Sequence, residues 1–371
     1  MLFIYIIAAL FVFYSLLIIY YWTVWRAIPE FPGPSYPVST KISVIIPARN
    51  EEENIGKLLS SLEKQSYPLK LYEIVVVDDH SEDNTKAIVK QYAKVRLLQL
   101  KADNINSYKK KALETGIGAA TGDLIITTDA DCVVQPGWLK SIVSFKEEKK
   151  AVVVAAPVAL YSNNSVLQIF QAIDFMVLQA ITGAAVSKNG SSMSNGANLA
   201  YERDAFYKVK GFEGVDYIAS GDDMLLIYKI GQQYPGRLHY LKSKEAIVFT
   251  EPMKTWKSFF NQRIRWASKA KEYGDKRITA VLLLVYLFNL SFPVLAVAGF
   301  FCYYCWLWLA GFWIAKTLVE LPLVYSAARF FGKQKLLLYF FFFQPLHIAY
   351  ILISGFFGQI GKYEWKGRKV K

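Results

Sequence analysis

Three pairs of acidic side chains stand where apolar segments of the chain end or begin. The pairs are Asp78 with Asp79, Asp129 with Asp131, and Asp222 with Asp223. Carboxylate oxygen atoms suit a divalent ion and hydrogen bonds to a ribose or a base, and they do not suit a bare phosphate. A divalent ion can neutralise the charge that develops when a bond to a diphosphate breaks. The pattern therefore favours a site that holds Mg²⁺ or Mn²⁺ against a nucleotide diphosphate.

Each pair also has a simpler explanation when it is considered alone. Acidic residues are common in turns, which would explain any one pair at the end of a strand. Asp222 and Asp223 directly precede the helix-like segment MLLIYKI, where carboxylates cap a helix or interact with its dipole. N-capping remains the simpler interpretation of this pair in isolation. Polar residues at several strand ends favour a binding site, because turn preferences explain one such end and not the recurrence of the pattern at several ends.

The segment TWKSFFNQRIRWASKAK, at residues 255–271, predicts an amphipathic helix. One hypothesis is an interfacial membrane anchor, because Trp and Lys favour that location. A second hypothesis is that Gln262, Arg263 and Arg265 donate hydrogen bonds to a diphosphate. Trp266 would then offer a flat face to a sugar, and the two hypotheses are compatible.

A parallel sheet is the predicted scaffold for the acidic pairs. Three segments are almost wholly apolar, KISVIIP (41–47), EIVVVDD (73–79) and DLIITTDAD (123–131), and the helix-like EEENIGKLLSSLEKQ separates the first two. Such runs are typical of buried strands in βαβ units. Ligands bind beyond the carboxyl ends of the strands in these sheets. We expect Arg49 and Glu51, which follow the first strand, to meet the acidic pairs there.

Two common α/β functions are excluded by the segment that follows the first predicted strand. This segment, PARNEEENIG, lacks the G-x-G-x-x-G pattern of dinucleotide dehydrogenases. A Walker-type glycine loop is also absent from the sequence. The predicted ligand is therefore held by carboxylates and not by a glycine-rich phosphate loop.

The composition predicts contact with lipid, because 54% of the residues are hydrophobic and 16% are aromatic, more than soluble domains ordinarily carry. The stretch from Leu2 to Trp25 holds no charged residue, and about 20 apolar residues suffice to cross a bilayer. A cleaved signal peptide is the alternative, but the chain has no basic start and no small-residue cleavage site before Arg26. Further long apolar segments follow at about 278–300, 303–328 and 336–358.

Basic residues next to the predicted spans indicate the orientation of the chain. They comprise Arg26, Lys41, Lys269, Lys271, Lys276 and Arg277. We therefore expect an integral protein of the cell (inner) membrane with its soluble part in the cytoplasm. Three complete C-terminal spans would place the basic tail outside, against this rule; the tail comprises Lys362, Lys366, Arg368, Lys369 and Lys371. The last segment, interrupted by Gln344 and Pro345, is the candidate for a re-entrant hairpin.

The net charge of +13 suits an anionic membrane surface or a phosphate-bearing ligand. Nucleic acid is a less favoured partner, because so much of the chain is lipid-soluble. Three cysteines are too few for a disulfide framework, which fits a reducing compartment around the soluble part.

Seven segments, taken in order, resemble the successive motifs of glycosyltransferase family 2, whose members have the GT-A fold. They are VIIPARNE, VVVDDHSEDNT, KKKALETGI, TTDADC, SNGANLAYERDAF, GDDMLL and QRIRW. The resemblance covers roughly residues 41–269 and is specific in its order and spacing, although each motif alone is weak. Together with the apolar segments and the flanking basic residues, it predicts an α/β GT-A (Rossmann-like, mostly parallel sheet) cytoplasmic domain plus transmembrane α-helices. The implied divisions are a transmembrane anchor at 1–28, the GT-A domain at 29–254, an amphipathic interfacial helix at 255–276, and a transmembrane bundle with a basic tail at 277–371.

The resemblance places the donor nucleotide and the metal at the predicted strand ends. The implied nucleotide-binding residues are Pro47, Arg49, Glu51, Asp79, Lys109, Lys110 and Asp129. Among them, Asp79 is implied for the uracil or ribose, and the two lysines for the phosphates. Asp129 and Asp131 correspond to the family's D-x-D motif. Asp131 is the implied ligand of Mg²⁺ or Mn²⁺, with Asp129 nearer the ribose and the diphosphate.

The family's catalytic base is the second acid of its acid pair, here Asp223, which follows Asp222. Many relatives have Glu in place of Asp222. The base takes the proton from the acceptor hydroxyl group as its oxygen attacks the anomeric carbon opposite the diphosphate, so the configuration inverts. The Q-x-x-R-W motif maps onto Gln262, Arg265 and Trp266, and in the family it closes over the diphosphate and lines the acceptor site.

The resemblance leaves three hypotheses for the function. The first is an inverting hexosyltransferase that uses a nucleotide sugar, by family habit UDP-linked, and a membrane-lipid acceptor. The second is a processive synthase of a polysaccharide such as hyaluronan, cellulose or poly-N-acetylglucosamine, which needs a hydrophilic channel through lipid. Apolar segments whose main charges are Lys316 and Glu320 favour the first. The third, a nucleotide-sugar sensor without catalysis, conflicts with the intact acids. The sugar, the nucleotide and the oligomeric state stay open.

Overall fold

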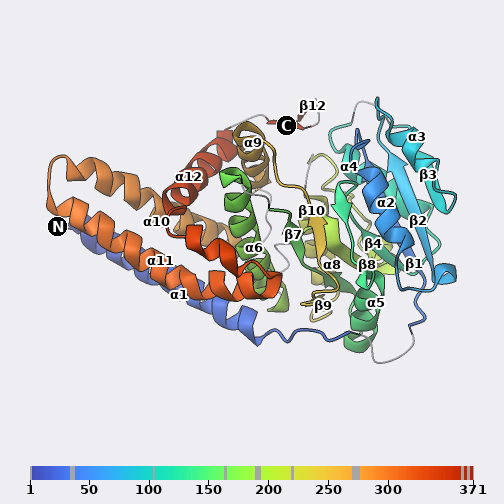
Figure 1. The fold of residues 1–371 in the computed structure, drawn as a ribbon, viewed down its shortest axis with the longest axis horizontal. Coiled ribbons are helices and arrows are strands. Elements are labelled where there is room, and N and C mark those ends of the chain that lie inside the picture. The colour runs from blue at the N-terminus through green and yellow to red at the C-terminus, as the bar shows by residue number, and fades with distance from the viewer. Residues whose placement is uncertain are drawn as a thin grey trace. The chain divides into compact units, whose positions relative to one another are not determined.

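The chain forms two compact units in a computed structural model (Figure 1). The residues described are 2–33, 38–102, 105–162, 165–188, 194–218, 221–269, 276–360, 363–365 and 368–370. The helical unit comprises Met1–Ala27, Ser162–Ala184 and Pro252–Tyr363, and the sheet unit comprises Ile28–Tyr161, Ala185–Glu251 and Glu364–Lys371. The domain expected at 29–254 is therefore interrupted by segment 162–184, which clusters with the other long apolar helices.

A seven-stranded sheet forms the core of the sheet unit, in the order β3-β2-β1-β4-β8-β6-β9. Its strands are β1 (Ile42–Ala48), β2 (Tyr72–Asp78), β3 (Val95–Gln99), β4 (Leu124–Thr127), β6 (Val153–Ala155), β8 (Leu199–Glu202) and β9 (Leu238–Tyr240). Strands β1 to β4 are parallel, and β8 runs antiparallel to β4 and β6. The three predicted strands are confirmed. The third ends at Thr127, so Asp129 and Asp131 follow it in a loop.

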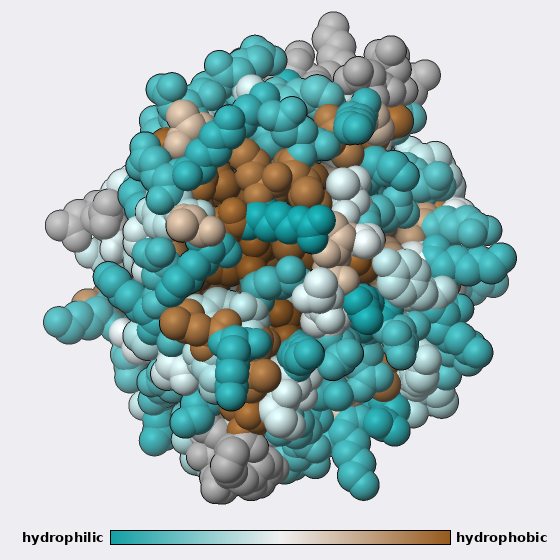
Figure 2. Space-filling model, turned by 90° about the vertical axis from the view of Figure 1, so that its right-hand side faces the viewer, coloured by the Kyte–Doolittle hydropathy of each residue, from teal (hydrophilic) through white to brown (hydrophobic). Residues whose placement is uncertain are grey.

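Helices and a smaller sheet surround these strands in the sheet unit. The helices are α2 (Ile55–Glu63), α3 (Thr85–Val89), α4 (Tyr108–Gly118), α5 (Trp138–Lys149), α7 (Arg203–Lys208), α8 (Asp222–Gln233) and the short 3₁₀ turns η1 (Leu69–Leu71) and η2 (Gly196–Asn198). The smaller sheet has the order β5 (Cys132–Val133), β10 (Val248–Thr250), β7 (Val158–Leu160). Helix α2 buries residues at helical spacing, Ile55, Leu58, Leu59 and Leu62, as an amphipathic pattern requires. The face turned to the viewer in Figure 2 is largely hydrophilic, with an apolar area at its centre.

Most of the helical unit consists of long apolar helices. They are α1 (Leu2–Ala27), most of α6 (Val166–Ser187), α10 (Lys276–Gly299), α11 (Tyr304–Phe331) and α12 (Gln344–Ile360), with the 3₁₀ segment η4 (Gln334–Tyr339) before α12. The unit also contains the shorter amphipathic helix α9 (Trp256–Ala267). A two-stranded sheet, β11 (Tyr363–Trp365) with β12 (Arg368–Val370), follows. Helix α1 packs on α10 and α11, and α12 packs on α9 and α10.

Four helices among the described residues, α1, α6, α10 and α11, are long and apolar enough to cross a membrane. Three of them match predicted spans, and the chain is a membrane protein. Helix α6 was not anticipated. Its most apolar window is 78% buried within the structure, against 17% for α1, so protein covers α6 where the other helices leave apolar side chains exposed.

The last predicted apolar segment, 336–358, is broken where the sequence indicated. Helix α12 begins at Gln344, whose amide oxygen accepts from the Lys316 ammonium at 2.5 Å and whose amide nitrogen donates to Glu320 at 2.6 Å. Lys316 and Glu320 also pair directly at 2.7 Å, and the Tyr14 hydroxyl donates to Glu320. Charges among apolar helices require such partners.

The side on which the C-terminus lies stays a prediction, as does the re-entrant hairpin. Several basic residues that enter the orientation argument, Lys271, Lys362, Lys366 and Lys371, lie outside the described residues.

Gly122 tests the packing of the turn before β4 against β1. A Cβ added at Gly122 would lie 2.5 Å from the carbonyl carbon of Ile42 and 2.6 Å from the nitrogen of Ser43. We expect Gly122→Ala to lower the apparent free energy of unfolding by about 1–3 kcal/mol, measured by denaturation in detergent. Gly118→Ala is the control, because an added Cβ there has nothing within 4 Å. Equal stability of the two variants would contradict this contact.

Candidate active site

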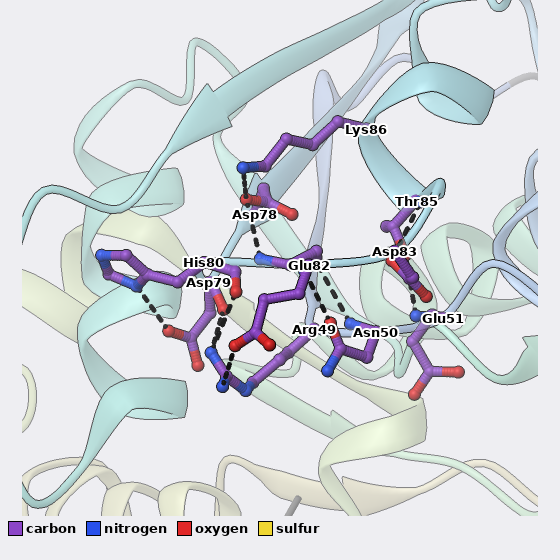
Figure 3. A network of polar contacts seen from close by, with 11 residues as sticks. Arg49, Asn50, Glu51, Asp78, Asp79, His80, Glu82, Asp83, Thr85 and Lys86 are labelled. Carbon is purple, nitrogen blue, oxygen red and sulfur yellow. Dashed lines mark hydrogen bonds and ion pairs between the residues drawn. The ribbon is translucent and has the colours of Figure 1, made fainter.

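The loops that follow β1 and β2 are joined into one polar network (Figure 3). The Arg49 guanidinium donates to the backbone carbonyl oxygens of Asp79 at 2.9 Å and His80 at 3.1 Å. In return, the side-chain oxygen of Asn50 accepts the backbone N–H of Glu82 at 2.9 Å. Asn50 and His80 have positive φ angles, 51° and 53°, which let both loops turn sharply. The network fixes the two strand ends relative to each other.

The predicted donor residues of the first two strands lie in or beside this network. Asp79 is buried, and a carboxylate oxygen lies 3.0 Å from Nδ1 of His80. The Glu51 carboxylate accepts from the Asn54 amide at 3.1 Å. Pro47 is half-buried near the end of β1. The structure therefore brings these residues to the carboxyl ends of neighbouring parallel strands, where ligands of such sheets bind.

A lysine joins the D-x-D segment to the acid pair. The Lys109 ammonium, in the first turn of α4, lies 2.7 Å from an oxygen of Asp129 and 3.2 Å from an oxygen of Asp222. Asp129 follows β4 and Asp222 begins α8. Residues from three separate motifs therefore meet at one cation.

Electrostatics keep this lysine charged. Burial opposes the charge, but the carboxylates of Asp129 and Asp222 outweigh that effect and raise the pKa of Lys109. The nearby Tyr201 phenol has a raised pKa because it is buried and because it faces the charge of Asp222. Lys109 is therefore a cation and Tyr201 a neutral phenol at physiological pH.

Backbone N–H groups hold the Asp223 carboxylate. One oxygen accepts from Gly196 at 2.9 Å, and the other accepts from Met224 at 2.7 Å. A Cβ added at Gly196 would lie 3.0 Å from an oxygen of Asp222 and 3.6 Å from Nζ of Lys109. A side chain at this position would therefore crowd the Asp222 carboxylate, which the SNGAN segment alone did not reveal.

Asn198 fixes the same loop from its buried side. Its side-chain oxygen accepts from the Trp138 indole at 2.9 Å, and its amide donates to the carbonyl oxygens of Pro157 and Ala246 at 2.7 Å each. Asn198 is fully engaged in the interior of the sheet unit. It therefore supports the loop that presents Gly196 to Asp223.

Lys110 differs from its neighbour Lys109. It is buried, and its ammonium donates to the carbonyl oxygens of Val215 at 2.5 Å and Ile218 at 2.9 Å. Adjacent helical residues point about 100° apart, so the two predicted phosphate contacts diverge. These bonds give Lys110 a part in holding the segment at 215–218.

Asp131 faces a cavity of about 260 Å³ in the sheet unit. The cavity is lined by Asn54, Lys57, Asp131, Cys132, Val133, Tyr161 and Glu251. Burial, with the negative charge of Glu251, raises the pKa of Tyr161. The sequence did not indicate Lys57, Tyr161 and Glu251 as site residues. The β5-β10-β7 sheet brings the segments of Tyr161 and Glu251 together, and the packing of α2 on β5 adds Lys57.

The thiol of Cys132 is buried where it lines this cavity. Burial and the charges of Asp131 and Asp129 raise the pKa of the Cys132 thiol. The thiol therefore stays protonated at physiological pH. Cys132, Cys302 and Cys305 are all free cysteines.

The D-x-D carboxylates suit a divalent ion whose remaining ligands come from the substrate and from water. Among the described residues, no group of three or more His, Cys, Asp or Glu side chains is placed to hold a metal ion. Asp129 and Asp131 are half-buried and offer hard oxygen atoms. A Mg²⁺ ion is commonly held by one or two carboxylates together with substrate phosphates and water. The donor set therefore fits an ion that binds together with a diphosphate.

Helix α9 of the helical unit carries the predicted diphosphate and acceptor residues. Gln262, Arg265 and Trp266 are half-buried, and their roles stay predictions. Arg263 is buried and pairs with Asp174 of α6 at 2.7 Å. Its guanidinium is therefore directed to a protein carboxylate inside the helical unit and not to a ligand.

Comparison with known proteins matches residues 43–210 to the family model described as glycosyl transferase family 2. The chain is 27% identical over 234 residues to a probable glycosyltransferase, YdaM, of Bacillus subtilis (strain 168), which is 61% of this chain and 54% of that protein. It is 26% identical over 235 residues to the poly-beta-1,6-N-acetyl-D-glucosamine synthase of Staphylococcus epidermidis, 62% of this chain and 55% of that protein. The chain thus spans about half the length of these curated relatives.

A solved structure shows the same fold. The mannosyltransferase PcManGT from Pyrobaculum calidifontis, in complex with GDP-Man and Mn²⁺, superposes with a TM-score of 0.60 over 96% of this chain and 98% of its own, at 19% identity. At that identity the likeness concerns the fold alone. The expected GT-A fold with its mostly parallel sheet is confirmed.

The bridge at Lys109 predicts a stability effect. The pKa of Lys109 is raised on folding, so its charged form stabilises the folded protein. This contribution to the free energy of unfolding is complete below the pKa of the unfolded state, about 10.4, and is lost only as the pH rises through the pKa of the folded state. We expect Lys109→Met to lower the apparent free energy of unfolding by about 1–3 kcal/mol at pH 7, measured by denaturation in detergent. Lys111→Met, which removes a more exposed lysine paired with Glu114, should change it by less than about 0.5 kcal/mol. Similar losses in both variants would refute the bridge.

Proposed function

We propose that this chain is a member of glycosyltransferase family 2, whose family model matches residues 43–210. The enzyme transfers a hexose from a nucleotide diphosphate sugar to a hydroxyl group of a membrane lipid, and it inverts the anomeric configuration. The observation that carries this proposal is the meeting of Asp129 and Asp222 at Lys109, with Asp223 beside them. That contact joins the family's donor motif to its acid pair.

The donor nucleotide binds at the ends of β1, β2 and β4 in this proposal. Asp79, held in place by the loop network of Arg49, contacts the base or the ribose. Pro47 and Glu51 flank it. A uridine nucleotide is the proposed donor by family habit, and the GDP-Man bound to PcManGT is the alternative. Lys109 lies between Asp129 of the D-x-D motif and Asp222 of the acid pair, where its charge also suits a diphosphate.

Asp131 and Asp129 would hold a Mg²⁺ or Mn²⁺ ion on the diphosphate. When bound, such an ion neutralises the negative charge that grows on the leaving group. The Mn²⁺ in the PcManGT complex supports this proposal. The residues of the chain then only need to orient the donor against the acceptor oxygen.

Asp223 is the proposed general base. Bonds from Gly196 and Met224 orient its carboxylate, whereas Asp222 is buried against the Lys109 ammonium. A base must be placed within hydrogen-bond reach of the proton that it abstracts. Asp223 takes the proton of the acceptor hydroxyl group, and the oxygen attacks the anomeric carbon opposite the diphosphate, which leaves.

A membrane lipid is the proposed acceptor because the buried charged residues of α11 bind other protein groups and do not line a channel for a polymer. Lys316 and Glu320 are buried as a pair and bound by Gln344, so they do not form the polar lining that a polysaccharide channel needs. Gln262, Arg265 and Trp266 bind the diphosphate and the acceptor. We place the GT-A domain in the cytoplasm and the helices in the cell membrane, on the charge pattern.

A processive polysaccharide synthase is the second candidate. The likeness to the Staphylococcus epidermidis synthase favours it. Membranes that contain the protein can be incubated with labelled nucleotide sugars, and the products separated by organic extraction. We expect the label in the organic phase, as a glycolipid. Label in aqueous material of high mass would replace the lipid proposal with the synthase.

Asp223→Asn tests the base. We expect the rate of transfer to fall by at least about 10²-fold, the usual contribution of a general base, while nucleotide binding, measured by calorimetry, stays unchanged. Asp204→Asn is the matched control, because Asp204 also lies in the first turn of a helix of the sheet unit. Its rate should stay at the wild-type value. A near wild-type rate for Asp223→Asn would make the base assignment wrong.

A further inference from the structure

Helix α6 holds α9 through two polar side chains one turn apart. The Gln171 amide donates to the carbonyl oxygen of Met253 at 3.0 Å and accepts the backbone N–H of Met253 at 2.9 Å. Three residues later, Asp174 pairs with Arg263 at 2.7 Å. Residues i and i+3 share a face of a helix. One face of α6 therefore fixes both the segment before α9 and the middle of α9.

The Arg263 guanidinium lies between this carboxylate and aromatic rings. Its central carbon is 4.3 Å from the ring centroid of Trp266, 5.1 Å from that of Phe259 and 5.8 Å from that of Tyr350. Nε and Nη1 of Arg263 are buried and make no hydrogen bond within the described part of the chain. Asp174 and the rings therefore set the orientation of the guanidinium.

Helix α6 also reaches Trp266 directly. The Phe175 ring, next to Asp174 in the sequence, lies 6.2 Å from that of Trp266, centroid to centroid. Trp266 is the last residue of the Q-x-x-R-W motif. Its indole therefore rests against α6 both through Phe175 and through Arg263.

A third helix completes the arrangement around Asp174. The Tyr350 hydroxyl of α12 donates to Asp174 at 2.8 Å, and Nε2 of His347 lies 3.9 Å from the same oxygen. Gly358 of α12 packs on the end of α9, where an added Cβ would lie 2.7 Å from the Cβ of Ala267. Asp174 is thus held at the junction of α6, α9 and α12.

Stability alone does not explain this ion pair. The side chains of Arg263 and Asp174 are 3% and 4% exposed, and the desolvation of two such charges offsets most of their attraction. Apolar replacements of buried ion pairs are often neutral or stabilising. The planar guanidinium, which can stack on a ring while it binds a carboxylate, instead suits the task of orienting a neighbour.

We propose that Asp174 is a positioning residue for acceptor binding: it orients Arg263, and through the guanidinium of Arg263 the indole ring of Trp266. This inference rests on the proposed function, in which Trp266 contacts the acceptor. Arg263 serves as the link between the carboxylate and the indole ring, and the diphosphate is left to Gln262 and Arg265.

The first test is kinetic. We expect Asp174→Asn to raise the acceptor KM by about tenfold or more, since small misplacements of binding groups have effects of this size. The affinity for the nucleotide should stay unchanged. Asp174→Glu, which keeps the charge, should recover part of the loss. An unchanged acceptor KM in Asp174→Asn would overturn the proposal.

A double variant separates positioning from stability. Asp174→Asn combined with Arg263→Met removes both charges, so the melting temperature should return toward the wild-type value. The acceptor KM should stay raised, because the indole ring has lost its oriented neighbour. If the KM recovered together with the melting temperature, the pair would be merely structural and the proposal wrong.

Glu320→Gln is the matched control. The Lys316–Glu320 pair has the same 2.7 Å separation, with side chains 1% and 8% exposed. Its hydrogen bonds go to Tyr14 of α1 and Gln344 of α12. We expect a lower melting temperature and an unchanged acceptor KM. An acceptor KM raised as much as in Asp174→Asn would show a general effect of buried charges and would overturn the inference.

Hydrogen exchange tests the inference without any enzymatic activity. The backbone of 256–267 should exchange faster in Asp174→Asn than in the wild-type protein, and not in Glu320→Gln. If the wild-type protein transferred no sugar, the proposed function would fail while this result still reported on the positioning of α9. Unchanged exchange in Asp174→Asn would refute the positioning role itself.

Discussion

The ammonium group of Lys109 is the contact on which the arrangement of acids in the sheet unit depends. Asp129 arrives from the end of β4 and Asp222 from the start of α8. Two carboxylates that share a partly buried site repel unless a cation lies between them, and otherwise one of them takes up a proton. The lysine therefore offsets the repulsion between the carboxylates of the two motifs. The two acids of the pair therefore have different partners. Asp222 pairs with the Lys109 ammonium, whereas backbone N–H groups orient Asp223.

Charges in the helical unit obey the same constraint under stricter conditions. Lys316 with Glu320 and Arg263 with Asp174 are buried as pairs, because an isolated charge among apolar helices is too costly. The first pair binds Gln344 at the start of α12, and the second ties α6 to α9. These two buried pairs thus serve as links between helices. This is the physical basis for preferring a lipid acceptor over a polymer that must pass through the membrane.

Local patterns in the sequence were enough to predict the strands β1, β2 and β4 and the long helices α1, α10 and α11. Apolar runs of strand length and uncharged runs of membrane length each leave a signal that depends on the residues themselves. Helix α6 shows the limit of hydropathy as a predictor. Its residues are apolar like those of a span, yet its most apolar window is 78% buried. Hydropathy measures the aversion to water and does not distinguish a lipid neighbour from a protein neighbour.

The sequence by itself determined the family motifs, their order, and the chemistry available at the strand ends. Only the tertiary structure decided which groups each side chain of a motif contacts. Lys109 and Lys110 are identical side chains in adjacent positions, but the helix turns one toward Asp129 and the other toward the carbonyl oxygens of Val215 and Ile218. Arg263 likewise could bind a diphosphate by its chemistry, but its guanidinium pairs with the carboxylate of Asp174, 89 positions earlier in the chain. The direction of a side chain is set by helical phase and by distant partners, which neither composition nor spacing records.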